Sequence, residues 1–99
     1  MNLIELKIQD IRRLCARHKV SRLFAFGSVL NDSFNDESDI DLIVDFDDIA
    51  LKDYADNYFD LKEELEQIFD RPVDLLEEKA IRNPYFRDEI DKERKLIYG

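Results

Sequence analysis

The segment DIDLIVDF, residues 39–46, constrains the fold more than any other part of the chain. Its apolar and acidic residues alternate with the two-residue period of a β-strand. One face would carry Ile40, Leu42, Val44 and Phe46, and the other would carry Asp39, Asp41, Ile43 and Asp45. The segment therefore predicts a strand that needs a cover for its apolar face and that begins with two aspartates.

Helical periodicity stands on both sides of this strand. Residues 2–18 and 50–69 repeat apolar side chains every three or four positions, as in amphipathic helices. A further helix is expected from Pro84 to about Glu93, with Asn83 as its N-cap, before an apolar tail at 96–98. Short apolar runs at 21–27 and 73–76 predict two more strands. This order indicates an α/β (α+β) fold, a small sheet with helices packed on it.

The size and charge of the chain limit what it can do. Its 99 residues are expected to form one domain, residues 1–99. A net charge of -9 repels phosphate backbones and argues against broad nucleic-acid binding or binding to anionic membranes. The sequence shows neither a signal peptide nor a membrane span, so we expect a cytoplasmic protein. The single cysteine, Cys15, excludes an internal disulfide and is expected in the core.

The aspartates at the start of the 39–46 strand suggest metal chemistry. Side chains two residues apart on a strand point the same way, so Asp39 and Asp41 can converge. Neighbouring carboxylates attract hard divalent cations such as Mg²⁺. If the strand at 73–76 lies alongside, Asp74 joins them. Three aspartates are a usual way to hold two metal ions that promote phosphoryl or nucleotidyl transfer.

Gly27 and Ser28 lie where the strand at 21–27 ends and a short helical turn is expected. The free backbone N–H groups of such a turn, with the Ser28 hydroxyl, can hold phosphate oxygens, and glycine leaves room for their approach. We therefore expect a phosphate site here, facing the aspartates.

These residues together resemble the signature of the minimal nucleotidyltransferase (MNT) family, within the DNA polymerase beta superfamily. The resemblance rests on Gly27-Ser28, the segment SDIDL ten residues later and Asp74, and the leading helix and the ending KERKLIYG extend it over nearly the whole chain. It implies a fold like the catalytic core of DNA polymerase beta.

The resemblance also implies roles for these residues. Asp39 and Asp41 would ligate two Mg²⁺ ions, while Asp74 would ligate the catalytic ion and help deprotonate the attacking hydroxyl. Gly27 and Ser28 would bind the triphosphate of a nucleoside triphosphate, with ATP as the expected substrate. Members are commonly antitoxins paired with HEPN toxins, and some transfer AMP from ATP to a tyrosine of the toxin. The resemblance therefore implies a HEPN-type toxin as the partner of this chain, with which it would form a hetero-oligomer.

Simpler interpretations of the same residues stay open. Asp39 and Asp41 could form a solvated acidic loop that runs into a strand, Asp74 could be an edge-strand or turn aspartate, and Ser28 could be a helix cap. Many relatives carry basic residues and a glycine where this chain has Val29-Leu30-Asn31-Asp32, which favours an alternative class, a non-catalytic antitoxin that neutralises its partner by contact.

Other polar residues receive structural interpretations. We expect Asp45, Asp47 and Asp48 to cap the next helix or to lie in solvent, and His18 to lie on the surface at the end of the first helix.

Overall fold

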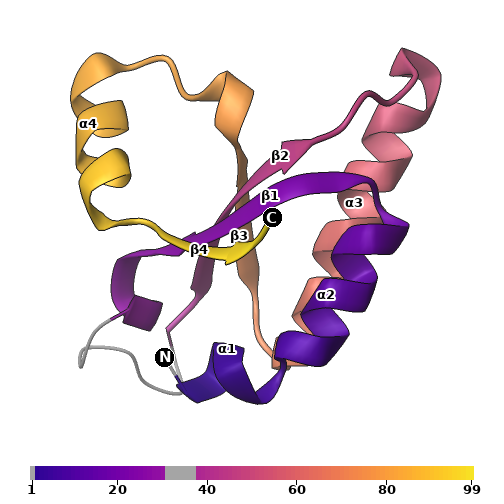
Figure 1. The fold of residues 1–99 in the computed structure, drawn as a ribbon, viewed down its shortest axis with the longest axis horizontal. Helices are drawn as coiled ribbons and strands as arrows, with labels where there is room; N and C mark the ends of the chain where they lie inside the picture. Colours follow the sequence, from indigo (N-terminus) through magenta and orange to yellow (C-terminus); the bar gives the residue numbers. More distant parts are fainter. Residues whose placement is uncertain (1, 31–37) are drawn as a thin grey trace.

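The computed structural model describes residues 2–30 and 38–99, without the side chains of Asn2 and Ser28. It contains a four-stranded sheet in the order β3-β2-β1-β4 (Figure 1). The strands are β1 (Val20–Phe26), β2 (Ile40–Phe46), β3 (Val73–Glu77) and β4 (Lys95–Tyr98). β2 and β3 are parallel, whereas β1 is antiparallel to both β2 and β4. The expected small mixed sheet is therefore confirmed.

The helices cover both faces of the sheet. The first helical segment is divided into α1 (Asn2–Leu6) and α2 (Ile8–Arg17), where we expected one continuous helix. The break occurs because the N–H of Lys7 donates to the carbonyl of Ile4, forming a tighter turn. α2 and α3 (Leu51–Phe69) pack together on one face, and α4 (Pro84–Glu93) lies on the other (Figure 1).

The larger core lies between the sheet and α2 and α3. The alternate residues of β2 predicted to face inward are all buried there, at 40, 42, 44 and 46. Cys15 is fully buried in the same core, and burial raises the pKa of its thiol to about 12. The apolar periodicities of the sequence thus correspond to one packed interior.

A smaller cluster of Phe24, Ile43 and Ile90 lies under α4. A network of ion pairs holds α4 beside it. Glu78, in the 3-10 turn η2 (Glu78–Ala80), accepts from Nη2 of Arg87 and, at 2.6 Å, from Nη1 of Arg94. The Arg94 guanidinium lies 4.1 Å from the centroid of the Phe24 ring, a cation–π contact. Because only 8% of the Glu78 side chain is exposed, this network is part of the interior.

The ends of α4 test two expectations. Asn83 caps the helix as predicted, since its Oδ1 accepts from the N–H groups of Tyr85 and Phe86. The segment after α4 was expected as an apolar tail, whereas residues Lys95–Tyr98 form β4 against β1. Four residues are too few to show strand alternation, so pairing with β1 decides their conformation.

His18 is buried, which contradicts the expected surface position. Its Nδ1 lies 3.1 Å from Oδ1 of Asn57, and its Nε2 is within hydrogen-bond distance of Glu64. The end of α2 packs against α3, and periodicity within α2 alone does not reveal that contact.

Across residues 2–30 and 38–99, no helix combines the length and the apolar composition needed to cross a membrane.

Candidate active site

A row of three side chains crosses the sheet on the face that carries α4. Phe26 of β1 is the Cα partner of Asp41 on β2, and Asp41 is the Cα partner of Asp74 on β3. Direct partners on neighbouring strands point to the same face, and the strands are about 4.8 Å apart. The condition set by the sequence, that the strand of Asp74 lies beside that of Asp41, is met.

Asp39 stands immediately before β2, two residues from Asp41. Asp39 and Asp74 are exposed, while Asp41 is half-buried. Burial and then the negative charges of Asp74 and Asp39 raise the pKa of Asp41. The three aspartates are therefore electrostatically coupled at one end of the sheet.

This set of groups fits a hard divalent cation in its chemistry. The donors are carboxylate oxygens, the ligands that Mg²⁺ prefers, and their mutual repulsion leaves negative charge for a cation to offset. In the described part of the chain, no three acidic, histidine or cysteine side chains are already arranged as a metal site. The backbone already aligns Asp41 with Asp74, so the change needed for binding a cation is a rotation of the aspartate side chains.

Gly27 touches the central aspartate of this row. It opens the 3-10 turn η1 (Gly27–Leu30) with φ of +75°, and a Cβ there would lie 2.6 Å from Oδ2 of Asp41. Both the backbone conformation and this close approach favour glycine. Ser28 follows in the same turn, and its side chain lies outside the described atoms. The structure thus places the Gly-Ser turn beside Asp41.

Replacing Gly27 with alanine is expected to destabilise the protein. The left-handed backbone costs about 1 to 2 kcal/mol in a residue with a Cβ, and the contact with Asp41 adds to that cost. Urea unfolding of Gly27→Ala in the wild-type and Asp41→Ala backgrounds would separate the two causes. Because the Cβ of Asp41 is 3.6 Å away, we expect a smaller loss in the second background. Equal losses would show that the carboxylate contact costs nothing.

Two further rows on this face are occupied by structural contacts. Phe24, Ile43 and Leu76 form the next row, on which Ile90 of α4 packs. Beyond this row, Oδ2 of Asp45 lies 3.0 Å from Nη2 of Arg22, and Oδ1 of Asp45 lies 3.9 Å from Nζ of Lys79. Asp45 is therefore neither a helix cap nor a solvent residue, contrary to expectation.

At the start of α3 the N-cap position is Ala50, and no side chain caps it. Asp47 and Asp48 lie exposed, which agrees with the second of the two positions expected for them.

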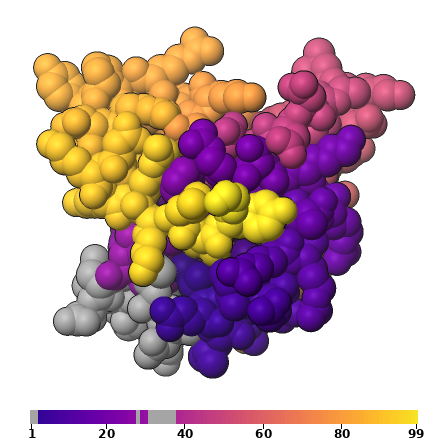
Figure 2. Space-filling view, viewed as in Figure 1, coloured from indigo at the N-terminus to yellow at the C-terminus, as the bar shows by residue number. Residues whose placement is uncertain are grey.

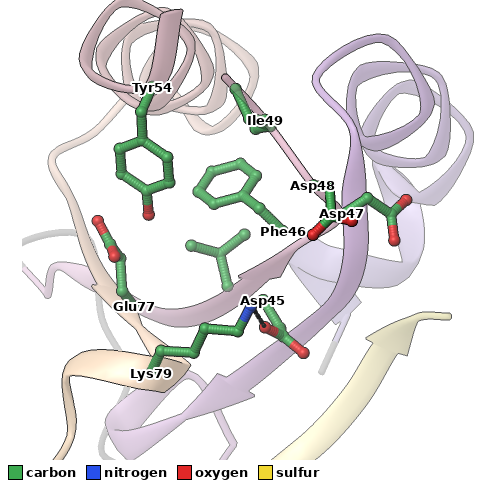
Figure 3. Close-up of a pocket in the computed structure, with 9 residues that line it drawn as sticks. Asp45, Phe46, Asp47, Asp48, Ile49, Tyr54, Glu77 and Lys79 are labelled. Carbon is green, nitrogen blue, oxygen red and sulfur yellow. Dashed lines mark ion pairs between the residues drawn. The ribbon is translucent and has the colours of Figure 1, made fainter. Parts of the chain in front are cut away.

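A pocket of about 160 Å³ lies at the other end of β2, beside residues 44–49 (Figure 3). In the space-filling view it belongs to the hollow between the orange segment near η2 and the pink start of α3 (Figure 2). Its polar groups face one another: Lys79 pairs with Asp45, and the Tyr54 hydroxyl points to Glu77. Burial and then the hydrogen bond to Glu77 raise the pKa of Tyr54. None of the predicted site residues lines this pocket, so the candidate site is the aspartate row.

Comparison with known families agrees with this geometry. A family model described as "Polymerase beta, Nucleotidyltransferase" matches residues 9–99. The chain belongs to this nucleotidyltransferase family. The resemblance inferred from Gly27-Ser28 and SDIDL is therefore confirmed.

Individual relatives of this nucleotidyltransferase are also similar over most of their length. A protein of Methanocaldococcus jannaschii named "Putative protein adenylyltransferase" is 38% identical over 82 residues, which cover 83% of this chain and 79% of the relative. A solved structure described as a "putative minimal nucleotidyltransferase" is 28% identical, with a TM-score of 0.76 over 93% of this chain and 90% of that one.

A more distant structure shares the fold. It is described as a tri-AMPylated Shewanella oneidensis HEPN toxin in complex with an MNT antitoxin. The similarity has a TM-score of 0.66 at 20% identity and covers 96% of this nucleotidyltransferase and 71% of that chain.

Proposed function

We propose that this nucleotidyltransferase transfers AMP from ATP to a tyrosine hydroxyl of a partner HEPN toxin and thereby acts as its antitoxin in the cytoplasm. The observation that carries the proposal is the register of Asp41 against Asp74, with Asp39 beside them. The adenylyltransferase name of the relative and the AMPylated toxin in the similar structure support this choice of nucleotide and acceptor.

The roles proposed for the side chains are those that the family resemblance implies, and the positions of the described residues support them. Asp39 and Asp41 would hold two Mg²⁺ ions, and Asp74 would share one of them. Bound Mg²⁺ stabilises negative charge on the attacking and leaving oxygens of such a transfer. Backbone N–H groups of the turn at Gly27 and Ser28 would hold the triphosphate next to Asp41.

The transfer itself forms one bond and breaks one. The acceptor hydroxyl oxygen bonds to the α-phosphorus of ATP, and the bond from that phosphorus to the oxygen of the β-phosphate breaks. Pyrophosphate leaves, and Asp74 accepts the hydroxyl proton. Asp74 suits this role because it is exposed at the edge strand β3, where an acceptor from a partner can approach.

A second candidate function is neutralisation by contact without catalysis. The observation that favours it is Val29, which follows Gly27-Ser28 and is only 5% exposed. Its apolar side chain packs in the larger core. The side chain at this position of the turn therefore offers the phosphates neither a positive charge nor a polar group.

The test is a transfer assay with the protein, Mg²⁺, ATP labelled on the α-phosphate and the protein encoded by the neighbouring gene. We expect label on the partner, and we expect Asp39→Asn to abolish it. Asp47→Asn, which removes the same charge from an exposed position beyond β2, is the matched control and should retain transfer. If the wild type transfers no label and Asp39→Asn still neutralises the partner, the contact function replaces the catalytic one.

A further inference from the structure

The turn between α3 and β3 holds the backbone on both sides of Asp39. Nη1 of Arg71 donates to the carbonyl oxygen of Ser38 at 3.2 Å. The N–H of Ile40 donates to the carbonyl oxygen of Pro72 at 3.1 Å. Two consecutive residues of the turn thus hold the two neighbours of Asp39.

This turn is itself firmly held. Asp70 ends α3 in the left-handed conformation, with φ of 53°. The N–H of Arg71 donates to the carbonyl of Glu66, and the N–H of Val73 donates to Oε2 of Glu66 at 2.9 Å. The turn can therefore act as a fixed support for the segment that it contacts.

Asp39 needs such a support more than Asp41 or Asp74 does. Asp41 and Asp74 lie within paired strands, whose ladder fixes their backbones. β2 begins at Ile40, so Asp39 precedes the ladder. The hydrogen bond from Arg71 to the Ser38 carbonyl holds the backbone on the N-terminal side of Asp39, which the strand pairing of β2 does not reach.

From this arrangement we infer that Arg71 is a positioning residue, which sets Asp39 for binding a divalent cation. The inference rests on the proposed function, because it uses the metal role of Asp39. Arg71 acts through the backbone carbonyl of Ser38. Hydrogen-bonding groups that orient a metal ligand without contacting the metal themselves also determine the affinity for the metal.

A purely electrostatic role for Arg71 predicts the opposite result. If the Arg71 guanidinium acted through its positive charge alone, it would repel a cation, so removal of that charge would tighten metal binding. Loss of positioning weakens metal binding instead. The sign of the change therefore distinguishes the two roles.

Titration with Mn²⁺, followed by electron paramagnetic resonance without nucleotide, tests the inference. Arg71→Gln is expected to weaken Mn²⁺ binding about tenfold. Arg71→Lys keeps the charge and one donor, so we expect an intermediate affinity. Arg13→Gln is the matched control, since Arg13 lies exposed on α2 beside Asp10 and should leave the affinity unchanged. Label transfer by Arg71→Gln should recover as Mg²⁺ is raised.

The outcomes separate the inference from the function on which it rests. If wild-type protein binds Mn²⁺ and Arg71→Gln binds it equally or more tightly, the inference is overturned and the proposed function stands. Wild-type protein that binds no Mn²⁺ and transfers no label overturns both. If Arg71→Gln does not fold, the comparison of Arg71→Lys with Arg13→Gln decides, and equal affinities there also overturn the inference.

Discussion

Asp41→Asn is expected to lower the rate of nucleotidyl transfer by about 1,000-fold, equivalent to about 4 kcal/mol of activation free energy. Asp41 is at the centre of the proposed site, because it faces Asp74 across the strands and Gly27 across the turn. An amide keeps the shape of the side chain but loses the negative charge that a divalent cation needs. Initial rates of label incorporation at saturating ATP and Mg²⁺ would measure the loss.

The same substitution is expected to stabilise the metal-free protein at neutral pH. Because burial and two neighbouring carboxylates raise the pKa of Asp41, the native state holds this proton more tightly than the unfolded state. The stability of the wild type therefore falls as the pH rises from the ordinary pKa of 3.8 to the raised value, and stays lower above it. Asp41→Asn removes this fall.

Urea unfolding in EDTA at pH 4 and pH 7 tests this expectation. The free energy of unfolding of the variant should exceed that of the wild type by more at pH 7 than at pH 4. In a separate measurement without EDTA, Mg²⁺ should stabilise the wild type but not the variant. A variant that is inactive and also less stable at pH 7 would instead indicate that Asp41 serves the fold. Asp47→Asn is again the control for the loss of one negative charge.

Glu78→Gln is expected to lower the free energy of unfolding by about 3 kcal/mol. The substitution keeps the side-chain volume but leaves two arginines, Arg87 and Arg94, facing a neutral amide. Arg94 is 19% exposed and stacks on Phe24, so its charge is poorly solvated, and after the substitution it keeps the half-exposed Asp91, at 3.4 Å, as an acidic partner. Equilibrium urea unfolding gives the change directly.

A surface pair on the same helix provides the control. Asp88 and Lys92 form an exposed pair at 2.9 Å, and Asp88→Asn should cost less than about 0.5 kcal/mol. If Glu78→Gln costs no more than Asp88→Asn, the network does not hold α4, and the small cluster of Phe24, Ile43 and Ile90 would have to do so alone.

The elements with long or strongly periodic patterns could be predicted from the sequence. The strand at 39–46, the helix at 50–69 and the Asn83 cap all follow from local rules, and each is confirmed. The fourth strand and the burial of His18 depend on contacts with distant segments, namely β1 and α3. Local periodicity carries no information about such contacts.

The candidate site was accessible to the same kind of reasoning only in part. Residue types and spacing pointed to Asp39, Asp41, Asp74, Gly27 and Ser28, but whether Asp74 lay beside Asp41 depended on strand order. The role inferred for Arg71 was not accessible from the sequence, because a hydrogen bond to the Ser38 carbonyl leaves no trace in residue types or spacing. The segment Val29-Leu30-Asn31-Asp32 was expected to favour a non-catalytic antitoxin. Val29 and Leu30 belong to η1 and supply no positive charge, whereas Asn31 and Asp32 lie outside the described residues.

The parallel register of β2 and β3 has a consequence for how this site can change. The register that sets Asp41 opposite Asp74 also sets Ile40 opposite Val73 and Leu42 opposite Leu75, on the buried face. Deleting one residue from β3 would turn Asp74 into the core and Leu75 toward the aspartates. One strand register therefore determines both the carboxylate pair and the packing of the interior. Substitution of an aspartate can remove the reaction and leave the fold intact, whereas a shift of the strand would disrupt both.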